Sequence, residues 1–208
     1  MKKTSAITCL LLDIGGVLLT DGWDHLARRR AAAHFKLNRA EMEDRHHLTF
    51  EIYEQGKITL DEYLSLVVFT EKRPFTRSQF RSFMFAQSEP FPEMIDMIVQ
   101  LKHRLKVKIV IVSNEGRELN AHRIQKFKLD RLADCFISSC FVHLRKPDVE
   151  IFELAMDVAQ IRASQAVFID NTPMFVQIAQ GLGIQSILHQ DMRSTRAKLS
   201  VIGLKIDE

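Results

Sequence analysis

The sequence has little cysteine, no long apolar run and no excess of charge of one sign. Its three cysteines, Cys9, Cys135 and Cys140, form neither a Cys-x-x-Cys pair nor an even-numbered set, which argues against structural disulfides and zinc sites. No apolar stretch approaches the roughly 20 residues that a membrane-spanning helix needs. The chain has 29 basic and 26 acidic residues and no sustained basic block beyond residues 28–30, so we expect no nucleic-acid partner.

Internal repeats and low-complexity linkers are also absent. The 208 residues, 46% of them apolar and 26% charged, are typical of a globular protein with one large domain or a core with an insertion. The start, Met1-Lys2-Lys3 before an apolar run, resembles a signal peptide, but Asp13 and the pair Gly15-Gly16 interrupt that run before a cleavage site. Together with the unpaired cysteines, this favours a cytoplasmic protein.

The apolar run at residues 7–12 predicts a strand buried on both faces, and it ends in Asp13. An unpaired, ionised carboxylate at the mouth of such a strand costs several kcal/mol, so folding tolerates it only beside a cation, a metal or several N–H donors. An Asp that caps a turn after the strand is the simpler interpretation of this stretch alone.

Residues 19–88 have a helical pattern with nearly balanced charge. We expect helices from Asp24 to about Phe35, over 40–55, from Thr59 to about Phe69 and from Ser78 to Ala86. The aromatic residues of the last helix are predicted to lie in a core. His46 and His47 are expected on a solvated helix face, because adjacent helical residues point about 100° apart and do not readily share a metal ion.

From residue 90 onward, strands alternate with helices. The strands are expected at residues 107–112, 135–139, 166–170 and 185–188, with helices over about 92–105, 117–127 and 173–181 and another starting near Asp148. This alternation predicts an α/β fold with right-handed βαβ units and a parallel sheet covered on both faces.

Polar side chains follow the predicted strands. Asp13, Ser113-Asn114 and Asp170 stand where three strands end, and Lys146 follows a fourth. Ligands of open α/β sheets bind at this edge. Two converging carboxylates suit Mg²⁺; Asp13 is then a candidate nucleophile, Lys146 offsets negative charge, and Ser113 holds phosphoryl oxygens.

Four ordered segments resemble the motifs of the haloacid dehalogenase-like (HAD) hydrolase superfamily. They are Asp13-x-Gly-Gly-Val-Leu, the strand that ends in Ser113-Asn114, Arg145-Lys146-Pro147-Asp148-x-x-Ile-Phe, and Val-Phe-Ile-Asp170 with a later Gly-x-Gly-Ile. The resemblance implies a Rossmann-like, doubly wound core (1–18 and 89–208) with a small all-helical cap (19–88) inserted after the first strand, as in the first subfamily. It also implies Mg²⁺ bound by Asp13, the carbonyl of Gly15 and Asp170, and a phosphatase that forms an aspartyl-phosphate on Asp13.

The chain departs from that pattern at two positions. Gly15 stands where phosphatases of the superfamily usually carry an acid/base Asp, and loss of such a group typically costs on the order of 10²–10⁴ in rate. Asp21, Glu115 and His25 are conceivable substitutes. Asn171 replaces a second acid after Asp170, which leaves an amide oxygen and one negative charge fewer.

Three functions are compatible with these residues. The first is Mg²⁺-dependent hydrolysis of a small phosphorylated metabolite. The second is a metal-independent 2-haloacid dehalogenase, for which a missing acid is no handicap, although such relatives tend to carry a bulky aromatic residue where Gly15 stands. The third is a catalytically degenerate protein that binds a phosphorylated ligand, against which the retention of Asp13, Lys146 and Asp170 argues.

Overall fold

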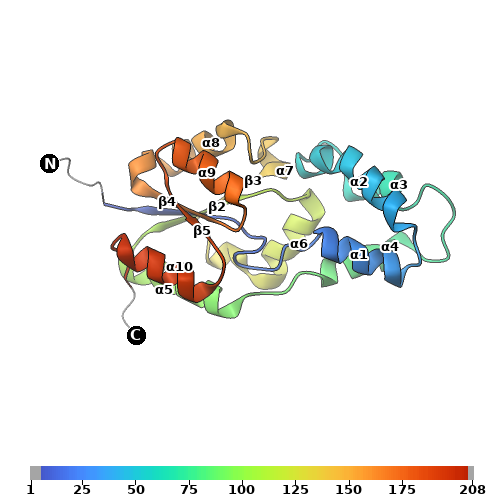
Figure 1. Cartoon of the computed structure of the whole chain (residues 1–208), viewed down its shortest axis with the longest axis horizontal. Helices are drawn as coiled ribbons and strands as arrows, with labels where there is room; N and C mark the ends of the chain where they lie inside the picture. Colours follow the sequence, from blue (N-terminus) through green and yellow to red (C-terminus); the bar gives the residue numbers. More distant parts are fainter. Residues whose placement is uncertain (1–5, 206–208) are drawn as a thin grey trace.

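The computed structural model describes residues 6–205 and contains one parallel sheet, with helices on both faces and a helical body at one end (Figure 1). The five strands run in the order β3-β2-β1-β4-β5. They are β1 (Cys9–Leu12), β2 (Lys108–Ser113), β3 (Cys135–Ser138), β4 (Ala166–Asp170) and β5 (Gln185–Leu188). The strand order reverses direction at β1, so the residues after β1, β2 and β4 share the edge where ligands bind in such folds. The expected α/β, Rossmann-like, doubly wound sheet is confirmed.

Alternation along β1 divides the core into two layers. Leu10 and Leu12 pack with α5 (Pro92–Leu105) and α10 (Met192–Val201), whereas Cys9 and Leu11 pack with α8 (Val149–Ala159) and α9 (Pro173–Gly181). Figure 1 shows these helix pairs on opposite sides of the sheet. Both faces of β1 are therefore buried against apolar side chains, which accounts for the uninterrupted apolar sequence of this strand.

Four helices between β1 and α5 form the helical body and have their own apolar cluster. They are α1 (His25–His34), α2 (Arg39–Glu54), α3 (Leu60–Val67) and α4 (Arg77–Ala86). Phe80 is fully buried in this cluster. A capping box of Thr59 and Glu62 starts α3, the helix expected from Thr59, and Thr76 with Gln79 forms a second one at α4.

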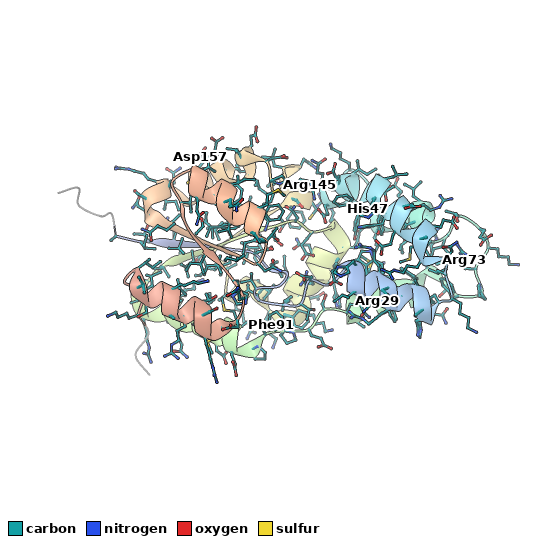
Figure 2. The ribbon with its side chains drawn as sticks, viewed as in Figure 1. Arg29, His47, Arg73, Phe91, Arg145 and Asp157 are labelled. Atoms are coloured by element: carbon teal, nitrogen blue, oxygen red, sulfur yellow. The ribbon has the colours of Figure 1, made fainter. Side chains whose placement is uncertain are left out.

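The helical body meets the core through close backbone and side-chain contacts. A Cβ on Gly116, just before α6 (Arg117–Phe127), would lie 2.0 Å from Cζ of Tyr53, so the ring of Tyr53 rests on bare backbone. Arg145 pairs with Glu51 (3.1 Å) and Glu54 (2.8 Å) of α2, and Figure 2 labels Arg145 where the core faces that helix.

Some details differ from the sequence-based expectations. The short helix α7 (Ser139–Val142), helix α10 and two 3₁₀ turns (Leu129–Arg131 and Ala163–Gln165) were not predicted. His46 is buried, and its Nδ1 lies 2.8 Å from Oη of Tyr63, so the solvated-face prediction is wrong for this residue. Burial lowers its pKa to about 3, with smaller effects of Arg28 and His47 in the same direction. His47 is exposed as expected.

The predicted segments 1–18 and 89–208 extend past both ends of the described residues, and Met1-Lys2-Lys3 lies outside them. Within residues 6–205, no helix is both long and apolar enough to cross a bilayer. Cys9, Cys135 and Cys140 are all free thiols.

Candidate active site

The two predicted acids meet at one lysine. Asp13 directly follows β1 and Asp170 ends β4, and Nζ of Lys146 lies 3.1 Å from Oδ2 of Asp13 and 2.6 Å from Oδ2 of Asp170. Each carboxylate has its other oxygen on a backbone donor: the N–H of Ile14 donates to Asp13 Oδ1 (2.8 Å), and that of Thr172 donates to Asp170 Oδ1 (2.7 Å). The strand ends therefore bring together three groups that are far apart in sequence.

These charges are buried. Lys146 and Asp170 are fully buried, and Asp13 keeps 8% exposure. Burial and the neighbouring charge of Asp13 raise the pKa of Asp170, which Lys146 only partly offsets. Burial alone would lower the pKa of Lys146, but the charges of Asp13 and Asp170 raise it above its usual value. Lys146 therefore stays protonated, and Asp13 is the member of the trio that a ligand can reach.

Asn114 positions the loop that carries Lys146. Its Nδ2 donates to the carbonyl of Lys146, and its Oδ1 accepts the backbone N–H of Lys146, both at 2.8 Å. Ser113 is the last residue of β2 and is 1% exposed. Both therefore lie at the predicted edge, with the amide of Asn114 holding Lys146. Lys146 is separated from β3 by helix α7 and does not directly follow the strand.

The turn after Asp13 leaves room for another acid. A Cβ on Gly15 would lie 3.3 Å from Oδ1 of Asp21, so the carboxyl of Asp21 stands beside the position that has no side chain. Gly16 has φ +66°, and a Cβ there would lie 1.9 Å from Nδ2 of Asn171. Asn171 in turn donates to Asp21 Oδ1 at 3.3 Å. Asp21 is exposed, yet desolvation by its surroundings raises its pKa.

A cavity of about 380 Å³ lies between the helical body and the core. All three conceivable substitutes for the missing acid, Asp21, His25 and Glu115, line it. Glu115 is 5% exposed and pairs with Nη1 of Arg123, which also donates through Nη2 to the carbonyl of Thr20. Burial raises the pKa of Glu115 to about 7, although Arg123 opposes this. The cavity therefore has acidic groups in two different environments.

The donors near Asp13 fit Mg²⁺. The set that the sequence predicts consists of the carboxylates of Asp13 and Asp170 and the carbonyl of Gly15. Within residues 6–205 no group of three or more His, Cys, Asp or Glu could hold a metal, whereas Mg²⁺ in proteins is usually held by one or two carboxylates together with water or phosphate. The single positive charge of Lys146 balances only one of the two buried carboxylates, and a divalent cation would offset the remaining negative charge.

A family comparison agrees with this geometry. The family model described as haloacid dehalogenase-like hydrolase matches residues 7–183. The chain belongs to this family. No curated protein matches the chain.

Solved structures of HAD proteins have the same fold. A HAD family enzyme from Bacteroides thetaiotaomicron, in complex with magnesium and inorganic phosphate, is 24% identical with a TM-score of 0.73, over 90% of this chain and 98% of that one. A predicted HAD-like family hydrolase from Porphyromonas gingivalis is 19% identical with a TM-score of 0.76, over 95% and 98%. The L-2-haloacid dehalogenase RSc1362 is 18% identical with a TM-score of 0.64, over 88% and 86%. At these identities the structures show the fold and not the substrate.

Sequence reasoning missed two residues, one that lines the cavity and one beside it. Tyr53 is 4% exposed and lines the cavity, and Arg123 is fully buried beside Glu115. Arg123 lies on α6 and Glu115 just before that helix, and Arg123 is buried in part because its guanidinium also reaches the carbonyl of Thr20, far away in sequence. Tyr53 looks like an ordinary core aromatic in the helical pattern, and no signal in the sequence connects it to the strand ends.

Proposed function

We propose that this HAD-like hydrolase is a Mg²⁺-dependent phosphohydrolase that acts on a small phosphorylated metabolite through an aspartyl-phosphate on Asp13. The convergence of Asp13, Lys146 and Asp170 carries this proposal. The similar Bacteroides enzyme, which was solved with magnesium and inorganic phosphate, supports it. In this proposal residues 19–88 act as the cap over the core at residues 1–18 and 89–208.

In the first step an oxygen of Asp13 forms a bond to phosphorus, and the ester oxygen leaves with the electrons of the broken P–O bond and takes a proton. Lys146 holds Asp13 in place, and Ser113 binds a phosphoryl oxygen. In the second step water attacks phosphorus, which releases phosphate and restores the carboxylate. Asp13, Gly15 and Asp170 would hold Mg²⁺, which when bound offsets the negative charge of the phosphoryl group.

Asp21 is our candidate for the acid that protonates the leaving oxygen and later accepts the proton of the attacking water. Its carboxyl stands beside Gly15, is fixed by Asn171 and lines the 380 Å³ cavity. Its exposure gives it access to solvent protons. Glu115 has the higher degree of burial, but its carboxylate is paired with Arg123.

Hydrolysis of p-nitrophenyl phosphate tests this function. We expect phosphate release with Mg²⁺, loss of release with EDTA, and a loss on the order of 10⁴-fold or more for Asp13→Asn. A single turnover of a phosphate ester with a radiolabelled phosphoryl group, stopped with acid, should leave the label on Asp13. Release of chloride from 2-chloropropionate in EDTA would instead identify a dehalogenase, and tight binding of a phosphorylated ligand without turnover at any pH would identify a degenerate binding protein.

A further inference from the structure

Two residues that line the 380 Å³ cavity each have a buried polar atom without a hydrogen-bond partner among residues 6–205. The atoms are Oε2 of Glu115 and Oη of Tyr53, which belong to residues with 5% and 4% exposure. A buried polar group without a hydrogen bond costs about 1–3 kcal/mol, so such groups in folded proteins usually have a partner. One is a carboxylate acceptor and the other a phenol that can donate. A ligand hydroxyl can satisfy both, since it donates to one and accepts from the other.

Among the described residues, no unpaired Lys or Arg lines the cavity to bind an anionic ligand. Arg28 is the only Lys or Arg in this lining, and its side chain donates to both oxygens of Glu43 (3.1 and 2.8 Å) and to the carbonyl of Trp23 (2.7 Å). The carboxyl groups of Asp21, Asp24, Glu54 and Glu115 line the same space. A second phosphate or a carboxylate on the ligand would be repelled by these carboxylates, with no unpaired Lys or Arg of the cavity lining to offset the repulsion.

The cavity is also next to the phosphate end of the site. Asn114, whose amide holds the backbone of Lys146, lines it together with Glu115. Its volume is within the range of roughly 300–1,000 Å³ for small-molecule pockets. A substrate whose phosphorus faces Asp13 can therefore place its alcohol part here.

We propose that the substrate is the monophosphate of a neutral, polyhydroxylated alcohol such as a sugar or polyol, and that Glu115 and Tyr53 together bind one of its hydroxyl groups. This proposal rests on the proposed phosphohydrolase function and specifies the class of its leaving group. Neither residue takes part in the bond changes at phosphorus. Both determine specificity.

A second cavity, of about 520 Å³, shares Asp21 and Asp24 with the first. It contains Arg30, whose Nε donates to Oε1 of Gln87 (2.7 Å) and which has no carboxylate partner among residues 6–205. Arg30 would attract a negative charge on a leaving group bound there, against the carboxyl groups of Asp21, Asp24 and Glu89, which also line this cavity. A preference of the enzyme for an anionic leaving group would therefore point to the second cavity, which contains Arg30.

Three substrates of similar shape test the proposal with the full-length protein and Mg²⁺. Glucose 6-phosphate has neutral hydroxyls, 6-phosphogluconate adds a carboxylate, and cyclohexylmethyl phosphate keeps a six-membered ring without hydroxyls. We expect kcat/KM for glucose 6-phosphate to exceed both others by at least about tenfold. Equal or higher kcat/KM for either of the others would overturn the proposal while p-nitrophenyl phosphate is still hydrolysed. Failure to hydrolyse any of the four would overturn the phosphohydrolase function, and this proposal with it.

Two substitutions test the residues. Tyr53→Phe removes only an unpaired hydroxyl, and Glu115→Gln removes a charge. Each should lower the ratio of kcat/KM for glucose 6-phosphate to that for cyclohexylmethyl phosphate by about tenfold, through KM more than kcat. Glu118→Gln is the matched control, because Glu118 also has an unpartnered buried Oε2 on α6 but does not line the cavity. If Glu115→Gln does not fold, Tyr53→Phe decides. An unchanged ratio in folded Tyr53→Phe, or the same change in Glu118→Gln, would contradict the assignment.

Discussion

The phosphate end and the cavity end of the site differ in how their buried polar atoms are paired. Around Asp13 and Asp170 all four carboxylate oxygens have donors, from two backbone N–H groups and Lys146. At the cavity end, Oε2 of Glu115 and Oη of Tyr53 have no hydrogen-bond partner in the described part of the chain. Groups that already have hydrogen-bond partners are held in place before the ligand binds, whereas unpaired buried groups can gain their hydrogen bonds from the ligand. The phosphate end would thus serve every phosphate ester, and the cavity end would select among them.

Replacement of Lys146 should break the phosphate end most severely. Lys146→Met leaves two buried carboxylates without their cation, so we expect the free energy of unfolding to fall by about 3–5 kcal/mol and hydrolysis to fall by several orders of magnitude. Denaturant titration and phosphate release measure these effects. The control is Lys102→Met, because the pair of Lys102 with Asp134 is partly exposed and should contribute less than about 1 kcal/mol. Equal destabilisation by the two substitutions would mean that Lys146 is not the central charge of the site.

Asp21 lies where the two ends meet, and its role shows in the dependence on the leaving group. Asp21→Asn should slow phosphorylation of the enzyme by phenyl phosphate on the order of 10²–10⁴-fold. The effect on p-nitrophenyl phosphate should be much smaller, because nitrophenolate leaves without a proton. Rapid-quench single turnovers measure both rates. Asp24→Asn is the control, since Asp24 lines the same cavity but caps α1, and Asn caps equally well. Equal slowing of both substrates by Asp21→Asn would rule out a general acid.

Glu115 makes the cavity end sensitive to pH. Its pKa of about 7, against 4.5 for an unperturbed Glu, reflects burial first, then opposition by Arg123 and repulsion by Asp13 and Glu54, with Lys146 lowering it. Between these two pH values the folded state holds a proton that the unfolded state has lost, so this group makes stability fall as pH rises from about 4.5 to 7. Glu115→Gln should remove this part of the slope, on the order of 1–3 kcal/mol. Thermal unfolding at pH 5 and 7.5 measures it, and an unchanged slope would mean that Glu115 is ionised throughout.

The phosphate end could be predicted from the sequence because it depends on topology alone. Asp13, Ser113 and Asp170 each stand at the end of an apolar run, and parallel strands bring such ends to one edge. No knowledge of helix packing is needed for that inference. Lys146 was placed by its motif, and the helix α7 before it was not foreseen because four residues give too little periodicity to recognise.

The cavity end could not be predicted, because it depends on how the helical body docks on the core. Tyr53 reaches the cavity only because Gly116, more than sixty residues later, leaves room for its ring. His46 shows the same limit. The sequence predicts an exposed position in an amphipathic helix, but the hydroxyl of Tyr63 and the surrounding apolar residues bury it.

The ion pair of Arg145 with Glu51 connects the two ends and should have the smallest effect. Arg145 precedes Lys146 in sequence and also contacts α2, the helix that carries Tyr53. The side chain of Glu51 is 63% exposed, against 25% for Glu54, which pairs with the same guanidinium. Solvent screens the more exposed pair, so Glu51→Gln should change the free energy of unfolding by less than about 1 kcal/mol, and by less still in high salt. Glu54→Gln leaves the more buried contact unmade and should cost more. If Glu51→Gln had the larger effect on unfolding or on KM, the exposed pair would hold the helical body on the core, and the cavity would depend on a surface charge.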